Sequence, residues 1–311
     1  MCGICGILEL RGGVADAGLV MRMSEAIAHR GPDGVGALAD GPVALGHRRL
    51  SIIDIEGGQQ PIANEDRTVQ VVFNGEIYNF VELRSELQVL GHQFRTRSDT
   101  EVIVHAWEQW GTECVNHFNG MFAFALWDRT QRRLFLARDH LGIKPLYYAV
   151  LGTQLVFASE IKALLVHPLC PRDVDLEAMG DLFTFRYVPS PRTLFRGIMK
   201  LPPGHWMTLG GGEMRIERYW KSIPVQRAAA PEAELVEQYQ QLLQDAVKLQ
   251  LRSDVPLGLF LSSGVDSALL LAIMTEQLKS PVHTFTMVLM AARPPTRSTM
   301  RARWRSSSAP T

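Results

Sequence analysis

The chain begins Met1-Cys2-Gly3-Ile4-Cys5-Gly6-Ile7-Leu8. This run of apolar and small residues is typical of a buried strand. Removal of Met1 would leave a thiol and a free α-amine on the same residue. Because a terminal amine has a pKa of about 7.7–8.0, it can accept a thiol proton near neutral pH. The position therefore makes Cys2 a candidate nucleophile. The alternative is a small apolar side chain at the start of a buried strand, and the residues downstream decide between them. Cys5 is expected to be an inert buried thiol.

Composition limits the class of protein. The chain has 311 residues, 46% of them hydrophobic, and a formal net charge of +0. It is therefore expected to hold two globular domains and to have no general affinity for nucleic acid or for anionic membranes. Four cysteines, at positions 2, 5, 114 and 170, fit neither a secreted disulfide scaffold nor paired zinc ligands. This cysteine usage favours a reducing cytoplasm. Neither a signal peptide nor a membrane span is found in the sequence.

Residues 1–220 show short β-rich runs with a few helices between them. A strand is predicted at 69–73, ending in an Asn74-Gly75 turn pair, and a helix at about 80–90. Ser98-Asp99-Thr100-Glu101 predicts a capping box for a helix that ends at about residue 110. A meander-like series of strands is predicted at 121–127, 133–137, 146–149 and 155–158. This grouping indicates an α+β arrangement of sheets faced by helices.

A change of pattern follows. Residues 221–233, with two prolines and an alanine run, predict a linker. In 234–287 a helix, an apolar strand, a Ser-Ser-Gly turn, a second helix and a further strand predict the start of a parallel α/β unit. Residues 288–311 contain five arginines and no acidic residue, and they have no hydrophobic period. They are expected to be a disordered or out-of-frame tail; the alternative is a basic interaction arm.

Several motifs occur in fixed order after the first residues. They are His29-Arg30-Gly31-Pro32-Asp33, His47-Arg48-Arg49-Leu50-Ser51-Ile52, Asn74-Gly75-Glu76-Ile77-Tyr78-Asn79 and Ser98-Asp99. With Cys2-Gly3-Ile4-Cys5-Gly6 they resemble the glutaminase domain of class II, N-terminal-nucleophile glutamine amidotransferases. Later motifs narrow the resemblance to glutamine-hydrolysing asparagine synthetase: Arg138-Asp139-His140-Leu141-Gly142-Ile143-Lys144-Pro145-Leu146-Tyr147-Tyr148, Phe157-Ala158-Ser159-Glu160 and Leu201-Pro202-Pro203-Gly204.

The resemblance implies a fold. Residues 1–220 would form a four-layer αββα domain of the N-terminal-nucleophile hydrolases. An incomplete α/β domain with a parallel sheet, of the ATP pyrophosphatase type, would follow at 234–287. Because family members are about twice as long, the chain is expected to be truncated and to retain at most glutaminase activity.

The resemblance also implies a glutamine site. Arg49 would hold the substrate's α-carboxylate in a bidentate fork. Asp99 would accept hydrogen bonds from the α-ammonium group, and Asn74 and Gly75 would form the oxyanion hole. The other glutamine-binding residues carried over are Leu50, Ser51, Ile52, Ile53 and Glu76. On the residues alone, Asp99 is equally an acid in the first turn of a helix, and Asn74-Gly75 a hairpin turn. His29 and His47 are expected to be structural.

A second motif resembles the pyrophosphate loop of the ATP pyrophosphatases, usually written S-G-G-x-D-S. It comprises Leu261, Ser262, Ser263, Gly264, Val265, Asp266 and Ser267, and Met287 is a further candidate on the adenine side. Small residues before a helix let backbone N–H groups approach phosphate, although Ser263 replaces the usual glycine. In the family, ATP with Mg²⁺ activates aspartate, and ammonia from glutamine then gives asparagine, AMP and pyrophosphate.

Other interpretations remain open. The chain could be a non-catalytic remnant of a disrupted gene, or its arginine-rich tail could bind nucleic acid or a partner. It could also be a related class II amidotransferase with another adenylated acceptor. The expected partners are the substrates glutamine, aspartate and ATP, with a homodimer as a further possibility. No metal ligand is assigned.

Overall fold

The computed structural model describes residues 1–221, 230–278, 280–287 and 306–307. They belong to two compact units, Met1–Pro224 and Val225–Thr311. No helix in the described part of the chain is long and apolar enough to span a bilayer.

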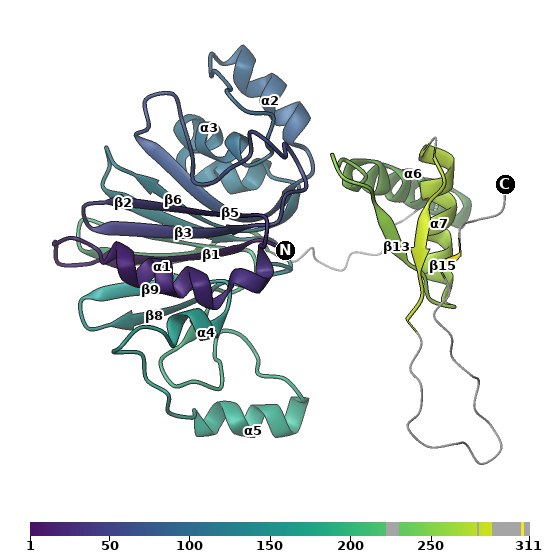
Figure 1. Cartoon of the computed structure of the whole chain (residues 1–311). Coiled ribbons are helices and arrows are strands. Elements are labelled where there is room, and N and C mark those ends of the chain that lie inside the picture. Colours follow the sequence, from purple (N-terminus) through teal and green to yellow (C-terminus); the bar gives the residue numbers. More distant parts are fainter. Residues whose placement is uncertain (222–229, 279, 288–305, 308–311) are drawn as a thin grey trace. The chain divides into compact units, whose positions relative to one another are not determined.

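Two antiparallel sheets form the centre of the first unit (Figure 1). The first sheet has the order β10-β8-β9-β1-β3-β2, made of β1 (Gly3–Glu9), β2 (Gly34–Asp40), β3 (Val43–Arg49), β8 (Tyr147–Leu151), β9 (Gln154–Ala158) and β10 (Met199–Lys200). The second has the order β12-β11-β7-β6-β5-β4, made of β4 (Ile62–Ala63), β5 (Val69–Ile77), β6 (Gly120–Asp128), β7 (Arg133–Arg138), β11 (His205–Gly210) and β12 (Glu213–Arg218).

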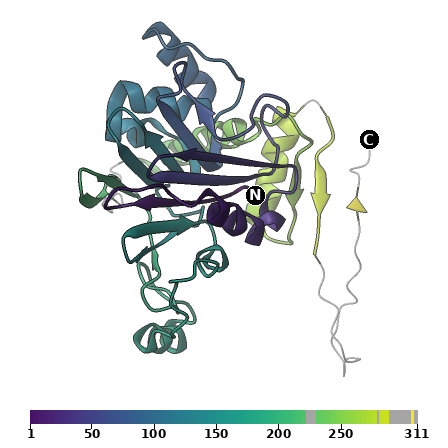
Figure 2. The same cartoon turned by 60° about the vertical axis from the view of Figure 1, so that its left-hand side comes forward.

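Helices cover the outer face of each sheet. The first sheet packs against α1 (Ala17–Ala26) and α4 (Ile161–Leu164), and the second against α3 (Glu101–Trp110). The other helical segments are α2 (Phe80–Val89), α5 (Leu176–Phe185) and the 3₁₀ turns η1 (Ala28–Arg30) and η2 (Gly111–His117). Figure 2 shows the sheets face to face with helices outside them. The predicted αββα arrangement is confirmed.

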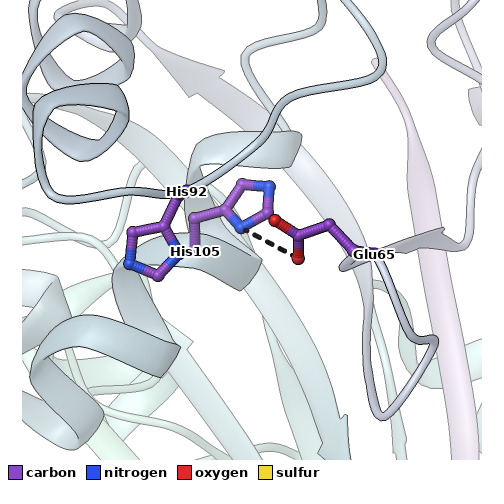
Figure 3. Close-up of side chains that lie close together, drawn as sticks. All are labelled: Glu65, His92 and His105. Atoms are coloured by element: carbon purple, nitrogen blue, oxygen red, sulfur yellow. Dashed lines mark ion pairs between the residues drawn. The ribbon is translucent and has the colours of Figure 1, made fainter.

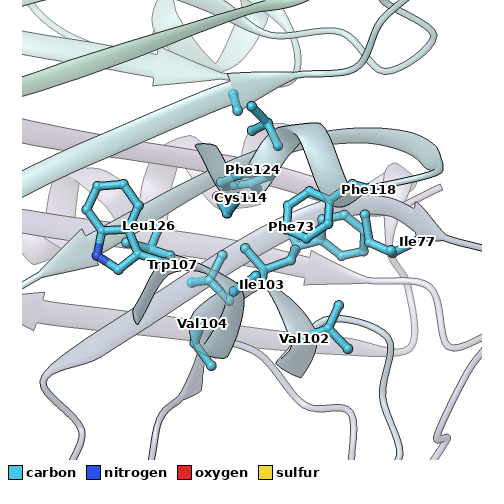
Figure 4. Close-up of a cluster of buried hydrophobic side chains, with 14 of the residues drawn as sticks. Phe73, Ile77, Val102, Ile103, Val104, Trp107, Cys114, Phe118, Phe124 and Leu126 are labelled. Atoms are coloured by element: carbon cyan, nitrogen blue, oxygen red, sulfur yellow. The ribbon is translucent and has the colours of Figure 1, made fainter. Parts of the chain in front are cut away.

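Each interface between layers has its own hydrophobic core. Ile4 and Leu45 of the first sheet meet Val72 and Leu136 of the second between the sheets. Figure 4 shows the core between the second sheet and α3, where Phe73 and Phe124 pack with residues such as Ile103. Alternate strand residues enter opposite faces, so each strand buried on both sides reads as a nearly continuous apolar run.

Three local predictions for the first unit need correction: the turn at Asn74-Gly75, the meander and the capping box. Asn74 and Gly75 do not form a turn, because β5 continues through them and pairs with β6 as far as Ile77. The predicted meander is split, since β7 belongs to the second sheet and β8 to the first.

The predicted capping box is absent. Glu101 accepts hydrogen bonds from the backbone N–H groups of Arg95 and Thr96 instead of from that of Ser98. The Ser98 hydroxyl accepts one from Thr100, two residues on. The predicted end of the helix at residue 110 is confirmed, with Gly111 at φ 57°.

The second unit contains α6 (Glu232–Gln250), β13 (Gly258–Phe260), α7 (Val265–Gln277), β14 (His283–Phe285) and β15 (Ser306–Ser307). The predicted parallel pair is confirmed, as β13 pairs with β14 in parallel. Its buried core comprises Val247, Ile273, Met274 and Val282. Most of the predicted linker, 222–229, lies outside the described residues. Of the predicted tail only Ser306 and Ser307 are described, paired antiparallel with β14.

Candidate active site

Strand pairing places Cys2 beside the end of β3. Gly3 on β1 is opposite Arg48 on β3, so Cys2, just before β1, lies against Leu50, just after β3. The Leu50 N–H group donates to Cys2 Sγ at 3.4 Å, and Sγ lies 3.6 Å from the Leu50 carbonyl oxygen. Arg30 Nε donates to the Cys2 carbonyl at 2.8 Å, which holds the backbone there. The thiol is therefore fixed by two strands and one side chain.

A cavity of about 300 Å³ opens at this thiol. The predicted residues that line it are Cys2, Arg49, Leu50, Ile52, Ile53, Asn74, Gly75, Glu76 and Asp99. Ser51 is not among its lining residues, and its backbone N–H donates to Asp33 at 2.8 Å. The cavity is also lined by residues that the sequence did not indicate: Met1, Gly58, Gln60, Phe73, Ser98, Thr100, Met121 and Lys144.

Asn74 contributes a buried amide to the wall of this cavity. Its side chain is fully buried on β5, and within the described structure neither Oδ1 nor Nδ2 has a hydrogen-bond partner. Leaving a buried polar group unpaired costs about 1–3 kcal/mol. Because the amide lines the cavity that contains Cys2, it is available to a ligand bound there.

Gly75 shows why glycine is required in the middle of a strand. It pairs with Phe122 on β6, and a side chain there would meet the Met121 carbonyl and lie 2.7 Å from Phe122 Cα. That spacing is too short for a real Cβ contact, so any other residue would separate the strands. The missing side chain also leaves the backbone open toward the cavity.

Asp99 supplies the acidic end of the cavity. It lies before α3, whose N-cap is Thr100, and is not an acid of the first helical turn. Its Oδ2 accepts a hydrogen bond from the Ile77 N–H at 3.0 Å. Burial raises the pKa of Asp99 to about 7, although that hydrogen bond opposes the shift. The negative charge of nearby Glu76 raises the pKa further.

Arg49 carries the opposite charge to Asp99. It is also buried, with 3% of its surface exposed. Its guanidinium donates to the carbonyls of Ile53, Asp54 and Ile55 at 3.2, 2.6 and 2.8 Å. The sequence did not indicate this role in fixing a loop. A guanidinium carries more N–H donors than these bonds use, so Arg49 can still bind an anion.

Lys144 adds a second cation that the sequence did not indicate as part of the site. Its Nζ lies 3.5 Å from Met1 Sδ, and burial lowers its pKa. The Asp139 carboxylate holds the Lys144 backbone N–H at 3.0 Å. In the sequence, Lys144 stands out only as part of the motif 138–148. That motif does not indicate that the Lys144 side chain lines the cavity.

The thiol and the chain's amine are electrostatically coupled. Burial raises the pKa of the Cys2 thiol, while burial lowers the pKa of the Met1 α-amine. This amine belongs to Met1, and removal of Met1 would place the α-amine on Cys2 itself.

His47 is buried outside the cavity that contains Cys2. Its Nε2 lies 3.1 Å from the Phe73 carbonyl oxygen, and burial lowers its pKa to about 3. His29 lies 3.1 Å from Glu160 at an exposed position. Neither histidine lines the cavity.

In the second unit the Ser-Ser-Gly segment connects β13 to α7. Ser262 Oγ and Ser267 Oγ lie 3.0 Å apart, and the Gly264 N–H donates to Ser262 Oγ at 3.1 Å. Gly264 is the N-cap of α7, so backbone N–H groups of the first turn point out of the helix start. Met287 follows β14 and is 68% exposed. A loop of this form can bind phosphate.

Comparison with known proteins agrees with this geometry. Residues 1–220 match the family model described as glutamine amidotransferase domain. The chain belongs to the glutamine amidotransferase domain family. Residues 238–304 match the model described as asparagine synthase.

The chain is also similar to curated proteins of known name. Glutamine-hydrolysing asparagine synthetase 3 of Bacillus subtilis is 40% identical over 92% of this chain and 48% of its own length. Amidase chyE of Penicillium rubens is 36% identical over 78% of this chain and 36% of its own length. This amidotransferase chain thus spans about half the length of the asparagine synthetases it matches.

Solved structures show the shared fold. Glutamine phosphoribosylpyrophosphate amidotransferase from B. subtilis has a TM-score of 0.52 at 18% identity, covering 98% of this chain and 72% of the other. The class II N-terminal-nucleophile amidotransferase fold implied by the motifs is therefore present.

Proposed function

We propose that the first unit hydrolyses glutamine to glutamate and ammonia, with Cys2 as the nucleophile. The observation that carries the proposal is the Asn74 amide, which has no partner in the described structure and lines the cavity that contains the Cys2 thiol. A site for amide hydrolysis needs a donor aimed at the oxygen that becomes negative. A buried donor without a partner meets that need.

The proposed reaction requires removal of Met1, which frees the α-amine of Cys2. The Cys2 α-amine takes the thiol proton, and Sγ attacks the substrate's side-chain carbonyl carbon. Asn74 and the Gly75 N–H stabilise the oxyanion. The C–N bond then breaks, the leaving nitrogen takes the proton from the ammonium group, and ammonia departs. Water hydrolyses the thioester, which releases glutamate and restores the thiol.

The charged side chains of the cavity suit the two charged groups on the substrate's α-carbon. Arg49 would bind the α-carboxylate, and Asp99 in its ionised form would bind the α-ammonium. The amide at the far end of glutamine's side chain would then lie at Cys2. Lys144 would add positive potential near the carboxylate or the thiolate.

For the whole protein we propose asparagine synthesis from aspartate and ATP, with release of AMP and pyrophosphate. The support is the identity to asparagine synthetases on both sides of the boundary between units. The start of α7 would bind the phosphates of ATP, and Mg²⁺ would bind through those phosphates and Asp266. The four cysteines are free thiols, which fits a reducing compartment, and we propose the cytoplasm.

A different acyl acceptor is the second candidate. It is favoured by the similarity to the amidase chyE over 78% of the chain. Incubating the protein with glutamine, ATP and either aspartate or another amino acid, and identifying the amide formed, separates the two.

The glutaminase proposal is tested with two matched cysteine variants. Wild type and Cys5→Ala should both release glutamate and ammonia, because the Cys5 thiol is buried outside the cavity. Cys2→Ala should release neither. Full activity in Cys2→Ala would refute the assignment, as would an active enzyme whose intact mass still includes Met1.

A further inference from the structure

We propose that Glu65, His92, His105 and Glu108 bind a divalent transition-metal ion of the zinc type. The four side chains lie outside the glutamine cavity. Glu65 lies between β4 and β5, His92 follows α2, and His105 and Glu108 are on α3. Figure 3 shows the Glu65 carboxylate facing the His105 ring, with His92 nearby. Segments separate in sequence thus bring nitrogen and oxygen ligands together.

The donor atoms are spaced as ligands of one ion. One donor atom each from Glu65, His92 and His105 lie within 4.8 Å of one another. Glu108 Oε2 lies 3.1 Å from His105 Nδ1 and 3.6 Å from His92 Nδ1. Glu65 Oε2 lies 3.9 Å from His105 Nδ1. Tetrahedral ligands at Zn–N distances of about 2.0–2.1 Å are roughly 3.4 Å apart, so small side-chain movements complete the site.

The histidines are oriented through their opposite nitrogens. His92 Nε2 lies 3.2 Å from the Gln109 side-chain oxygen, which has only lone pairs to offer and so takes a proton from Nε2. His105 Nε2 faces Glu101 Oε1 at 3.7 Å. The Gln109 contact leaves Nδ1 of His92 as its unprotonated nitrogen, whereas His105 Nδ1 lies 3.1 Å from Glu108 Oε2 and would exchange its proton for the metal. A carboxylate or carbonyl behind each histidine is the usual outer partner of a metal ligand.

The carboxylates are oriented in the same way. Glu65 Oε1 accepts from the Gln93 N–H at 2.9 Å, and Glu108 Oε1 accepts from Asn64 Nδ2 at 2.7 Å. In each residue the other oxygen, Oε2, is the one that faces the histidines. Outer hydrogen bonds therefore orient His92, Glu65 and Glu108. Burial on α3 holds His105.

The charge balance also suits a divalent ion. Two carboxylates and two neutral imidazoles around M²⁺ give a net charge of zero, which favours binding at a half-buried position.

The ion would have a structural role. It would join α3 to the segment before β5 and to the segment that leads from His92 to Asp99. Glu101, beside His105, already holds the backbone N–H groups of Arg95 and Thr96 on that segment. All four positions would be taken by protein ligands, which leaves none open for substrate.

Cobalt titration of metal-free, untagged protein tests the proposal. The Cys2→Ala background removes the reactive thiol as a competing ligand. One equivalent of Co²⁺ should produce the visible absorption of a tetrahedral site, Zn²⁺ should abolish it, and Zn²⁺ should raise the unfolding temperature.

Two variants give the comparison. His92→Gln should bind Co²⁺ at least about tenfold more weakly. His117→Gln, whose histidine stacks on Trp110 outside the cluster, should bind as the parent does. Unfolding curves of the metal-free proteins show whether each variant is folded, and Glu65→Gln replaces His92→Gln if that variant is not. No tetrahedral absorption, or equal affinity in parent and folded variant, would overturn the proposal.

Discussion

The carboxylate of Asp99 is tied to the backbone of Ile77, with 3.0 Å between Oδ2 and the amide nitrogen. Ile77 ends β5, the strand that also carries Asn74 and Gly75. One strand therefore fixes the distance between the acidic end of the cavity and the Asn74 amide that lines the same cavity. For the proposed substrate, this relationship sets the spacing between the ammonium and oxyanion positions.

Glutamine affinity should rise with pH through neutrality. Burial gives Asp99 a pKa of about 7, and only its ionised form attracts an ammonium group. The ionised fraction rises roughly tenfold between about pH 6 and pH 8, so the dissociation constant should fall by about that factor. Calorimetric titration of Cys2→Ala with glutamine measures binding without turnover.

The direction of this pH dependence follows from the linkage between proton binding and glutamine binding. A raised carboxyl pKa means that the free site holds a proton which bound ammonium must expel, so binding improves as pH rises and levels off above the pKa. Asp99→Asn should bind weakly at every pH. An affinity that is flat across this range in the Asp99 protein would contradict the account.

Asn74→Ala should separate activity from stability. We expect kcat to fall about 100- to 1,000-fold, because an oxyanion donor is lost. The free energy of unfolding should stay the same or increase, because the amide it removes has no partner in the described structure.

A matched asparagine supplies the control. Asn79 donates to the His117 carbonyl at 2.9 Å and accepts from the Asn119 N–H at 2.9 Å. Asn79→Ala should lose about 1–3 kcal/mol of stability while the folded enzyme keeps its kcat. If Asn74→Ala were instead destabilised with kcat intact, the amide would have a structural role only.

Gly75→Ala should damage both folding and catalysis, since the added methyl group would push Met121 and Phe122 away and shift the backbone N–H. Gly180→Ala is the comparison: nothing lies within 4 Å of its added Cβ, and it is in α5. That change should leave activity unaltered and raise stability by up to about 1 kcal/mol. Thermal unfolding and glutaminase assays on both variants measure the difference.

Arg49→Lys should weaken substrate binding and loosen the loop at 53–55. One ammonium group cannot hold three carbonyls and a carboxylate, and each charged hydrogen bond is worth about 1.5–3 kcal/mol. We expect KM for glutamine to rise about 10- to 100-fold.

The adjacent arginine provides the control for that substitution. Arg48 contacts Ser24 and Glu25 on α1, and it does not line the cavity. Arg48→Lys should leave KM within about twofold of wild type. Equal KM values for the two variants would remove Arg49 from the substrate site.

Much of the fold was predictable because its signals are local. The apolar runs at 121–127 and 133–137, and the helical spacing near residue 80, depend on neighbours a few residues away. The order of the motifs that follow Cys2 also identified the family from residue types alone. The wrong prediction of a turn had an equally local origin, since Asn74-Gly75 has the composition of a turn but lies inside β5.

The sequence by itself determined the kind of chemistry, since a cysteine at position 2 and the ordered motifs specify residue types that do not depend on packing. Only the tertiary structure decided which side chains meet: Lys144 enters the cavity from a distant loop, Asn74 has no partner among the described residues, and Arg49 holds a loop. Those facts depend on strand register and layer packing, which join residues more than a hundred positions apart and leave no pattern among sequence neighbours.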